Sequence, residues 1–217
     1  MITDLGPLAQ LRAGRLPRRL LQLAVGLVLY GVSLGMMIRG ALGLAPWDVL
    51  HSGLIRHVPI SIGQALVAVS VVVMLGWIPL REKPGLGTIA NTLVLGPSAD
   101  ATLAVLDRPE GPLLRVALMA GGVVLCALAT AMYVGAQLGR GPRDGLMTGL
   151  VRRTGLSIRL VRTAMEVTVV VVGVLLGGSL GLGTVLFALT IGPLTQWLLP
   201  MWVVQLDEPA IVSSASR

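Results

Sequence analysis

Charged side chains are scarce in this sequence. Aspartate, glutamate, lysine and arginine together make up 12% of its 217 residues, whereas 54% are hydrophobic. Soluble domains contain about 25% charged residues. So few charges cannot cover a surface that faces water, which excludes an ordinary soluble domain and predicts a protein embedded in the lipid bilayer.

Aromatic residues are also few, at 3%, and Cys126 is the single cysteine. One cysteine cannot form a disulfide within the chain, and its apolar surroundings in the sequence favour a packing role. The net charge of +7 comes from basic residues at the ends of apolar runs, without the aromatic residues that would stack on bases. We therefore predict no nucleic-acid partner and a role for these charges in membrane orientation.

Sequence motifs of common enzyme classes are missing as well. The chain has no His-Glu-x-x-His, Walker A, Gly-x-Ser-x-Gly or cysteine-pair motif. His51 and His57 are six residues apart, a spacing that does not place them on one helical face. We expect no enzyme activity, no metal site and no cofactor.

What the sequence does contain is six apolar runs, each long enough to cross a hydrocarbon core of about 30 Å as a helix. A basic segment precedes the first run, as in a signal peptide, but the length of that run and its later counterpart favour a membrane helix. Gly31 and Gly35 give this first helix a small-residue face for close packing. We predict an all-α membrane protein with spans at about 20–38, 61–80, 86–106, 113–136, 157–177 and 181–202, a cytoplasmic segment 1–17 and a polar tail 205–217.

The apolar runs belong to an internal repeat with a constant offset of 96 residues. The phrase Gly-Leu-Gly-Thr occurs at 85–88 and at 181–184, and Gly-Pro occurs at 96–97 and at 192–193. Pro46 and Asp48 match Pro142 and Asp144 at the same offset. Matched glycine, proline and aspartate in register predict a duplication, with repeat 1 at 18–107 and repeat 2 at 113–204. A short interfacial or re-entrant helix follows the first span of each repeat.

The number of spans in each repeat predicts how the two repeats lie in the membrane. Three is an odd number, so the second repeat enters from the side opposite to the first, which gives an inverted-topology repeat. With both termini in the cytoplasm, all but four of the 17 lysines and arginines fall in inner segments, as the positive-inside rule requires. The four outer residues are Arg39, Arg56, Arg108 and Arg115.

The two Gly-Pro pairs are the first candidate site. Proline lacks the amide hydrogen that bonds the carbonyl four residues back, so Pro97 frees the carbonyl of Leu93 and Pro193 that of Leu189. Helices broken at matched points often bind a solute at the midplane. We predict such a pocket between the third and sixth spans, at Gly96-Pro97 and Gly192-Pro193. The alternative is a pair of kinks that serve packing.

Other polar residues extend the candidate substrate site. Asp48 and Asp144 either interact with the positive ends of the short helices or face the cavity from the two repeats. Thr88 and Thr184 cap or bond across helices, with an anion cradle at the glycine phrases as the alternative.

Two more candidates lie within the predicted spans. Arg162 and Glu166, four residues apart, form either a functional or a structural ion pair. Asn91 is a polar group on the third span.

The segment 43–50, Gly-Leu-Ala-Pro-Trp-Asp-Val-Leu, together with the phrases at 85–88 and 96–97, resembles the YczE/YyaS/YitT family of bacterial integral membrane proteins. The resemblance covers about residues 18–202 and implies a bacterial inner-membrane protein of about six helices. A soluble C-terminal domain of the YitT kind is absent, so regulation through one is not expected.

Two functions fit these features. The first is a small-solute transporter or permease whose partners are the bilayer and a small molecule. The second is a non-transporting scaffold or regulatory membrane protein that presents the arginines of 140–162 to a partner or to anionic lipid.

Overall fold

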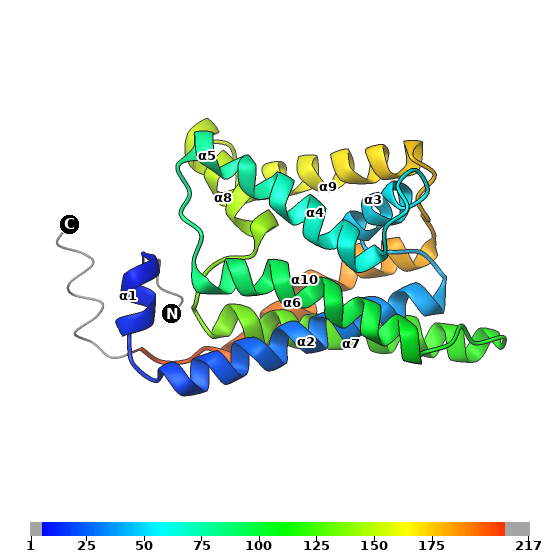
Figure 1. Ribbon diagram of the computed structural model, residues 1–217, viewed down its shortest axis with the longest axis horizontal. Coiled ribbons are helices and arrows are strands. Elements are labelled where there is room, and N and C mark those ends of the chain that lie inside the picture. Colours follow the sequence, from blue (N-terminus) through cyan, green and yellow to red (C-terminus); the bar gives the residue numbers. More distant parts are fainter. Residues whose placement is uncertain (1–5, 207–217) are drawn as a thin grey trace.

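The computed structural model describes residues 6–206, and its regular elements in that range are α-helices (Figure 1). The predicted polar tail lies largely outside the described residues. With α4 and α5 taken as one stretch, the bounds of the long helices fall within four residues of the predicted spans. The helices are α1 (Pro7–Arg12), α2 (Leu16–Gly40), α3 (Pro46–Leu54), α4 (Ile62–Leu75), α5 (Trp77–Leu80), α6 (Leu86–Val105), α7 (Pro112–Gly135), α8 (Pro142–Thr154), α9 (Ile158–Leu175) and α10 (Leu182–Trp202).

Within residues 6–206, four stretches are long and apolar enough to cross a membrane: α2, α4 with α5, α7 and α10. The other two predicted spans are also helices of 18 residues or more, α6 and α9. Polar residues interrupt the apolar character of α6, and α9 carries Arg159, Arg162 and Glu166. A six-span count therefore stays a prediction, whereas the membrane class is supported by helices with large exposed apolar side chains such as Leu93, Leu189 and Val72.

The helices form two layers (Figure 1). In one layer α6 packs on α2, α2 on α7, and α7 on α10, so α2 and α7 lie between α6 and α10. The glycines of the predicted small-residue face make the close α2–α6 contact: a Cβ on Gly31 would lie 2.4 Å from Ser98, and one on Gly35 would lie 2.6 Å from Thr102. The packing role predicted for these glycines is confirmed.

The second layer contains α4, α5 and α9 with the two short helices (Figure 1). Each short helix packs on the other half of the chain: α3 on α9, and α8 on α4 and α5. Glycines again permit the approach. A Cβ on Gly173 would lie 2.6 Å from the backbone of Leu50, and a Cβ on Gly145 would lie 2.0 Å from the Trp77 ring. The short helices are thus packed within the protein.

Contacts between the two halves recur in reciprocal pairs. The amide of Gly87 donates to the carbonyl of Leu138 at 2.7 Å, and 96 residues on, the amide of Gly183 donates to the carbonyl of Leu42 at 2.8 Å. The turns that place these carbonyls match too, since Gly43 (φ +123°) and Gly139 (φ +127°) both adopt positive φ, which glycine tolerates without strain. The repeated sequence therefore folds into repeated local structure.

Two arginines at matched positions cap the ends of α2 and α7. Arg19 is fully buried and donates to the carbonyls of Ala136 at 2.8 Å and Gln137 at 2.7 Å. Its counterpart Arg115 donates to the carbonyls of Gly40 at 3.0 Å and Ala41 at 2.8 Å. A cation at a helix C-terminus satisfies carbonyls that have no partner within the helix and interacts favourably with the helix dipole.

The predicted break at the Gly-Pro pairs is wrong. Helix α6 continues through Pro97, and α10 continues through Pro193. Both proline rings are exposed on the outside of the protein, as are Leu93 and Leu189 one turn earlier. Proline removes only one backbone hydrogen bond, and a long helix packed on its neighbours tolerates that loss.

Candidate functional site

The two short helices begin near the centre of the molecule. Pro46 and Pro142 occupy their first turns, where a missing amide hydrogen costs nothing, and Asp48 and Asp144 follow two residues later. A carboxylate in the first turn is stabilised by the positive end of the helix dipole. This local sequence therefore starts a helix and brings an acid toward the centre from each half of the chain.

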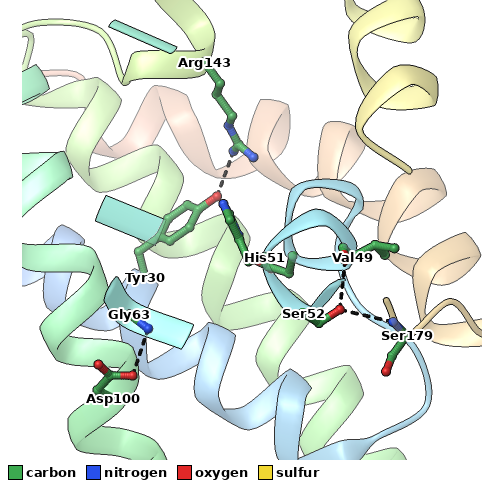
Figure 2. Close-up of polar contacts among 9 residues, drawn as sticks. Tyr30, Val49, His51, Ser52, Gly63, Asp100, Arg143 and Ser179 are labelled. Atoms are coloured by element: carbon green, nitrogen blue, oxygen red, sulfur yellow. Dashed lines mark hydrogen bonds and ion pairs between the residues drawn. The ribbon is translucent and has the colours of Figure 1, made fainter. Parts of the chain in front are cut away.

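Around these acids lies a cluster of hydroxyl and guanidinium groups. Arg143 on α8 donates to the Tyr30 hydroxyl on α2 at 2.7 Å (Figure 2), and the Tyr133 hydroxyl on α7 donates to Asp144 Oδ2 at 2.7 Å. The two tyrosine rings meet edge to face with centroids 6.2 Å apart. Helices α2 and α7 thus converge on the start of α8.

The acid of the first half has a different partner. Asp48 Oδ1 lies 3.1 Å from His51 Nδ1, and both side chains are buried. His51 lies beside Tyr30 and Arg143 (Figure 2), and all three line a small cavity of about 60 Å³ that also reaches Asn91. A small pocket with polar groups in its lining therefore adjoins the start of α3.

A larger cavity, of about 650 Å³, lies on the other side of this cluster. Trp47, Tyr133 and Arg143 line both cavities, so they form the wall between them. The large cavity extends from that wall to the side of the molecule that carries α1 and the α5–α6 connection. Its charged lining consists of Arg81, Glu82, Lys83, Arg140, Arg143, Asp144, Arg152, Arg162 and Glu166.

The large cavity lies where the two halves pack differently. We call the contact between α4 and α6 in the first half, and the matching region between α9 and α10 in the second half, the seams. In the first half α4 packs closely on α6. Asp100 accepts a hydrogen bond from the Gly63 amide at 2.9 Å (Figure 2) and another from the Ser61 hydroxyl at 2.5 Å. No comparable packing joins α9 to α10 in the described part of the chain. The positions that match Gly63 and Asp100 are Arg159 and Gln196, and Gln196 lines the cavity.

Several predicted site residues come together in these cavities, and others do not. Asp144, Arg162, Glu166 and Gly192 line the large cavity, whereas Asp48 and Asn91 line the small one. Among the described residues Pro97 and Pro193 line neither cavity, and α2 and α7 separate α6 from α10. The predicted location between the third and sixth spans is therefore wrong, and the cavities lie between the two layers instead.

The predicted Arg162–Glu166 pair is present on α9. Arg162 Nε lies 2.9 Å from Glu166 Oε1, and both side chains are partly exposed at the edge of the large cavity. The two charges neutralise one another, so the pair alone adds no net charge to the cavity.

Thr88 and Thr184 cap and bond across helices, as predicted. Thr88 Oγ1 accepts from the Gly85 amide at 3.1 Å and donates to the Arg140 carbonyl at 2.7 Å. Thr184 Oγ1 accepts from the amides of Gly181 and Leu44. Because the glycine amides already have partners within the protein, they do not form the anion cradle that was the alternative.

Sequence reasoning missed Tyr30, Tyr133, Arg143 and His51. A signal was present, since Tyr30 and Tyr133 are the only two tyrosines of the chain and both fall in apolar runs. A phenol hydroxyl in such a run needs a polar partner. The pKa of Arg143 is raised well above its usual value, chiefly by electrostatic interaction with Tyr30 and further by Asp144.

Comparison with known proteins places the chain in a family. Residues 17–200 match the model of the "Family of unknown function (DUF6198)". An "Uncharacterized protein" of Haemophilus influenzae is 40% identical over 177 residues, which cover 82% of this chain and 81% of that protein.

Two further relatives come from Bacillus subtilis. The "Uncharacterized membrane protein YczE" is 32% identical over 84% of this chain and 86% of its own length. The "Uncharacterized protein YyaS" is 25% identical over 82% and 90%. No solved structure matches the chain. On the extent of these matches, the chain belongs to the YczE/YyaS family of membrane proteins.

Proposed function

We propose that this protein is a small-solute transporter made of two inverted three-span repeats, in a state whose cavity opens toward the cytoplasm. In this proposal all six long helices cross the bilayer, and the solute binds between the two layers, where α3 and α8 begin. The observation that carries the proposal is that matched seams in the two halves differ. The α4–α6 seam is closed, and the α9–α10 side holds a cavity of about 650 Å³.

The difference between the closed and the open seam fits an alternating-access mechanism. In inverted-repeat transporters the two halves exchange conformations, so that closing one seam accompanies opening the other. The cavity reaches Gly6, Gln10 and Lys83, which lie in segments that the charge distribution assigns to the cytoplasm. Its inner wall at Tyr133 and Arg143 would then be the point that each side reaches in turn.

Three of the arginines that a scaffold would present to a partner have contacts within the protein. Arg143 bonds Tyr30, Arg152 lies 3.1 Å from Glu82, and Arg153 donates to the carbonyl of Pro79. At Arg152 and Arg153 a docking partner or a lipid headgroup has to displace these contacts, and Arg143 lines the cavity. The contacts therefore favour transport over the scaffold function.

Reconstitution tests the proposal. We expect purified protein in liposomes to take up at least one member of a panel of small radiolabelled solutes above the rate of protein-free liposomes. Asp144→Asn should lower that uptake at least tenfold, because it removes the carboxylate at the inner wall, whereas Arg153→Gln on the same helix should not change it. Absence of uptake for the whole panel, or equal uptake by Asp144→Asn, would contradict a transport site at this position.

A further inference from the structure

The charged lining of the large cavity is unequal in sign. It comprises six basic side chains and three carboxylates. Glu82 is paired with Arg152 at 3.1 Å, Glu166 with Arg162 at 2.9 Å, and Asp144 lies 3.9 Å from Arg143. What remains is a basic surplus within a concave, partly desolvated space, and such a space attracts anions.

Arg143 is the basic group at the inner end of this cavity. One hydrogen bond from its guanidinium, to Tyr30, is seen within the described residues. Its Nε lies 3.9 Å from Asp144 Oδ1, which is an ion-pair contact too long for a hydrogen bond, and Tyr133 donates to the other oxygen of that carboxylate. Arginine has five N–H donors in one plane. A guanidinium that uses one of them can therefore bind a carboxylate ligand through two others.

Apolar side chains also line the cavity. Trp47, which matches Arg143 in the repeat, lines the cavity with Met147, Met165 and Ile191. A ligand that fits this lining has an anionic end and an apolar body. A volume of about 650 Å³ lies within the usual range of about 300–1,000 Å³ for small-molecule sites.

We propose that the large cavity binds a small organic carboxylate, with Arg143 as the residue that holds the carboxylate group. This inference rests on the proposed transport function and names the class of its solute. Trp47 and the methionines then contact the apolar body, and Tyr30 keeps the guanidinium in place at the wall between the two cavities.

Ligand binding by purified protein tests the inference without any transport measurement. The probes are benzoate and benzamide, which share a ring and differ in charge, added in a chloride-free buffer while thermal unfolding in detergent is followed. We expect benzoate to raise the unfolding temperature in a saturable way and benzamide not to do so. Equal stabilisation by both probes, or by neither, would overturn the inference.

Variants locate the site. Arg143→Gln should raise the dissociation constant for benzoate about 10- to 100-fold, the loss expected for a hydrogen bond to a charged group. Arg143→Lys should retain part of the affinity, and Arg153→Gln, which removes a charge elsewhere on α8, should retain all of it. Unchanged affinity in Arg143→Gln would overturn the inference.

A folding control and the uptake assay separate the remaining outcomes. Tyr30→Phe removes the same Tyr30–Arg143 hydrogen bond but keeps the guanidinium, so it should bind benzoate within about threefold of the unaltered protein, as expected for one modest hydrogen bond. Loss of binding in Tyr30→Phe equal to that in Arg143→Gln would overturn the role of the charge. Benzoate binding without uptake of any solute would support the carboxylate site and contradict transport. Uptake that benzoate does not inhibit would support transport and contradict the carboxylate site.

Discussion

The two halves of this protein contain matching helices in the same order, but the α4–α6 seam of the first half differs from the α9–α10 seam of the second. In the first half, Gly63 lets α4 approach α6 so closely that a Cβ would lie 2.3 Å from the carbonyl of Gly96. In the second half the matching position is Arg159, and a Cβ on Gly192 would meet nothing within 4 Å. The comparison teaches that a few side chains decide whether the repeated scaffold is closed or hollow.

The contacts that hold the scaffold together are where the halves agree. Arg19 and Arg115 bond equivalent carbonyls, and so do the amides of Gly87 and Gly183. The two halves thus share the contacts that hold the helices together and differ at the cavity. We expect this of a duplicated unit in which the shared contacts serve stability and the cavity serves function.

The largest effect is expected from the caps of α2 and α7. Arg19→Met leaves at least two buried carbonyls without a partner and should lower the free energy of unfolding by about 3 kcal/mol. Arg115→Met removes the equivalent bonds in a half-buried setting and should cost about half as much. Thermal or denaturant unfolding in detergent measures both. A near-zero effect of Arg19→Met would break the equivalence of the two caps.

The next effect separates the closed seam from the open one. Gly96→Ala forces a methyl group to within 2.4 Å of the Gly63 carbonyl and should destabilise by about 2 kcal/mol. Gly192→Ala is the matched control: its methyl group enters open space, so stability should stay the same or rise slightly. Equal destabilisation by both alanines in unfolding measurements would contradict the difference in packing.

A smaller effect concerns the hydrogen bonds that close the first seam. Asp100→Asn weakens the bonds to Gly63 and Ser61 and should cost about 1 kcal/mol. In a Cys126→Ala background, a Val67→Cys thiol in this seam should then react faster with a water-soluble maleimide. The same thiol with Asp100 intact is the control, and unchanged reactivity would show that Asp100 does not hold the seam.

An effect of the same size is expected from the two threonines. Thr88→Val and Thr184→Val each remove hydrogen bonds that join the halves, and each should cost about 1 kcal/mol. Unfolding temperatures of the two variants should agree closely. A loss confined to one variant would show that the reciprocal contacts are unequal in strength.

Much of the scaffold was predictable from the sequence. Apolar runs located the helices, and the constant offset of 96 matched positions that prove to make reciprocal contacts, such as Gly43 and Gly139. Proline at 46 and 142 marked the short helices. These features are local, and local chemistry suffices to determine them.

The site was less predictable because it depends on which helices are neighbours. Lipid and protein interior are both apolar, so hydrophobicity does not distinguish the exposed face of Pro97 from the buried face of Asn91. The choice of α6 and α10 as partners followed from matched prolines, whereas packing is determined by glycines on α2. Tyr30 and Arg143 lie 113 residues apart, and no spacing in the sequence reports such a contact.

The central claim is that the two halves lie in the membrane in opposite orientations, and labelling of matched thiols tests it most directly. Val58 and Thr154 are exposed residues 96 positions apart, just beyond α3 and at the end of α8. In intact cells with Cys126→Ala, a membrane-impermeant maleimide should label Val58→Cys from outside and should reach Thr154→Cys only after the membrane is opened. Labelling of both thiols from the same side would contradict the inverted repeat and the transport mechanism built on it.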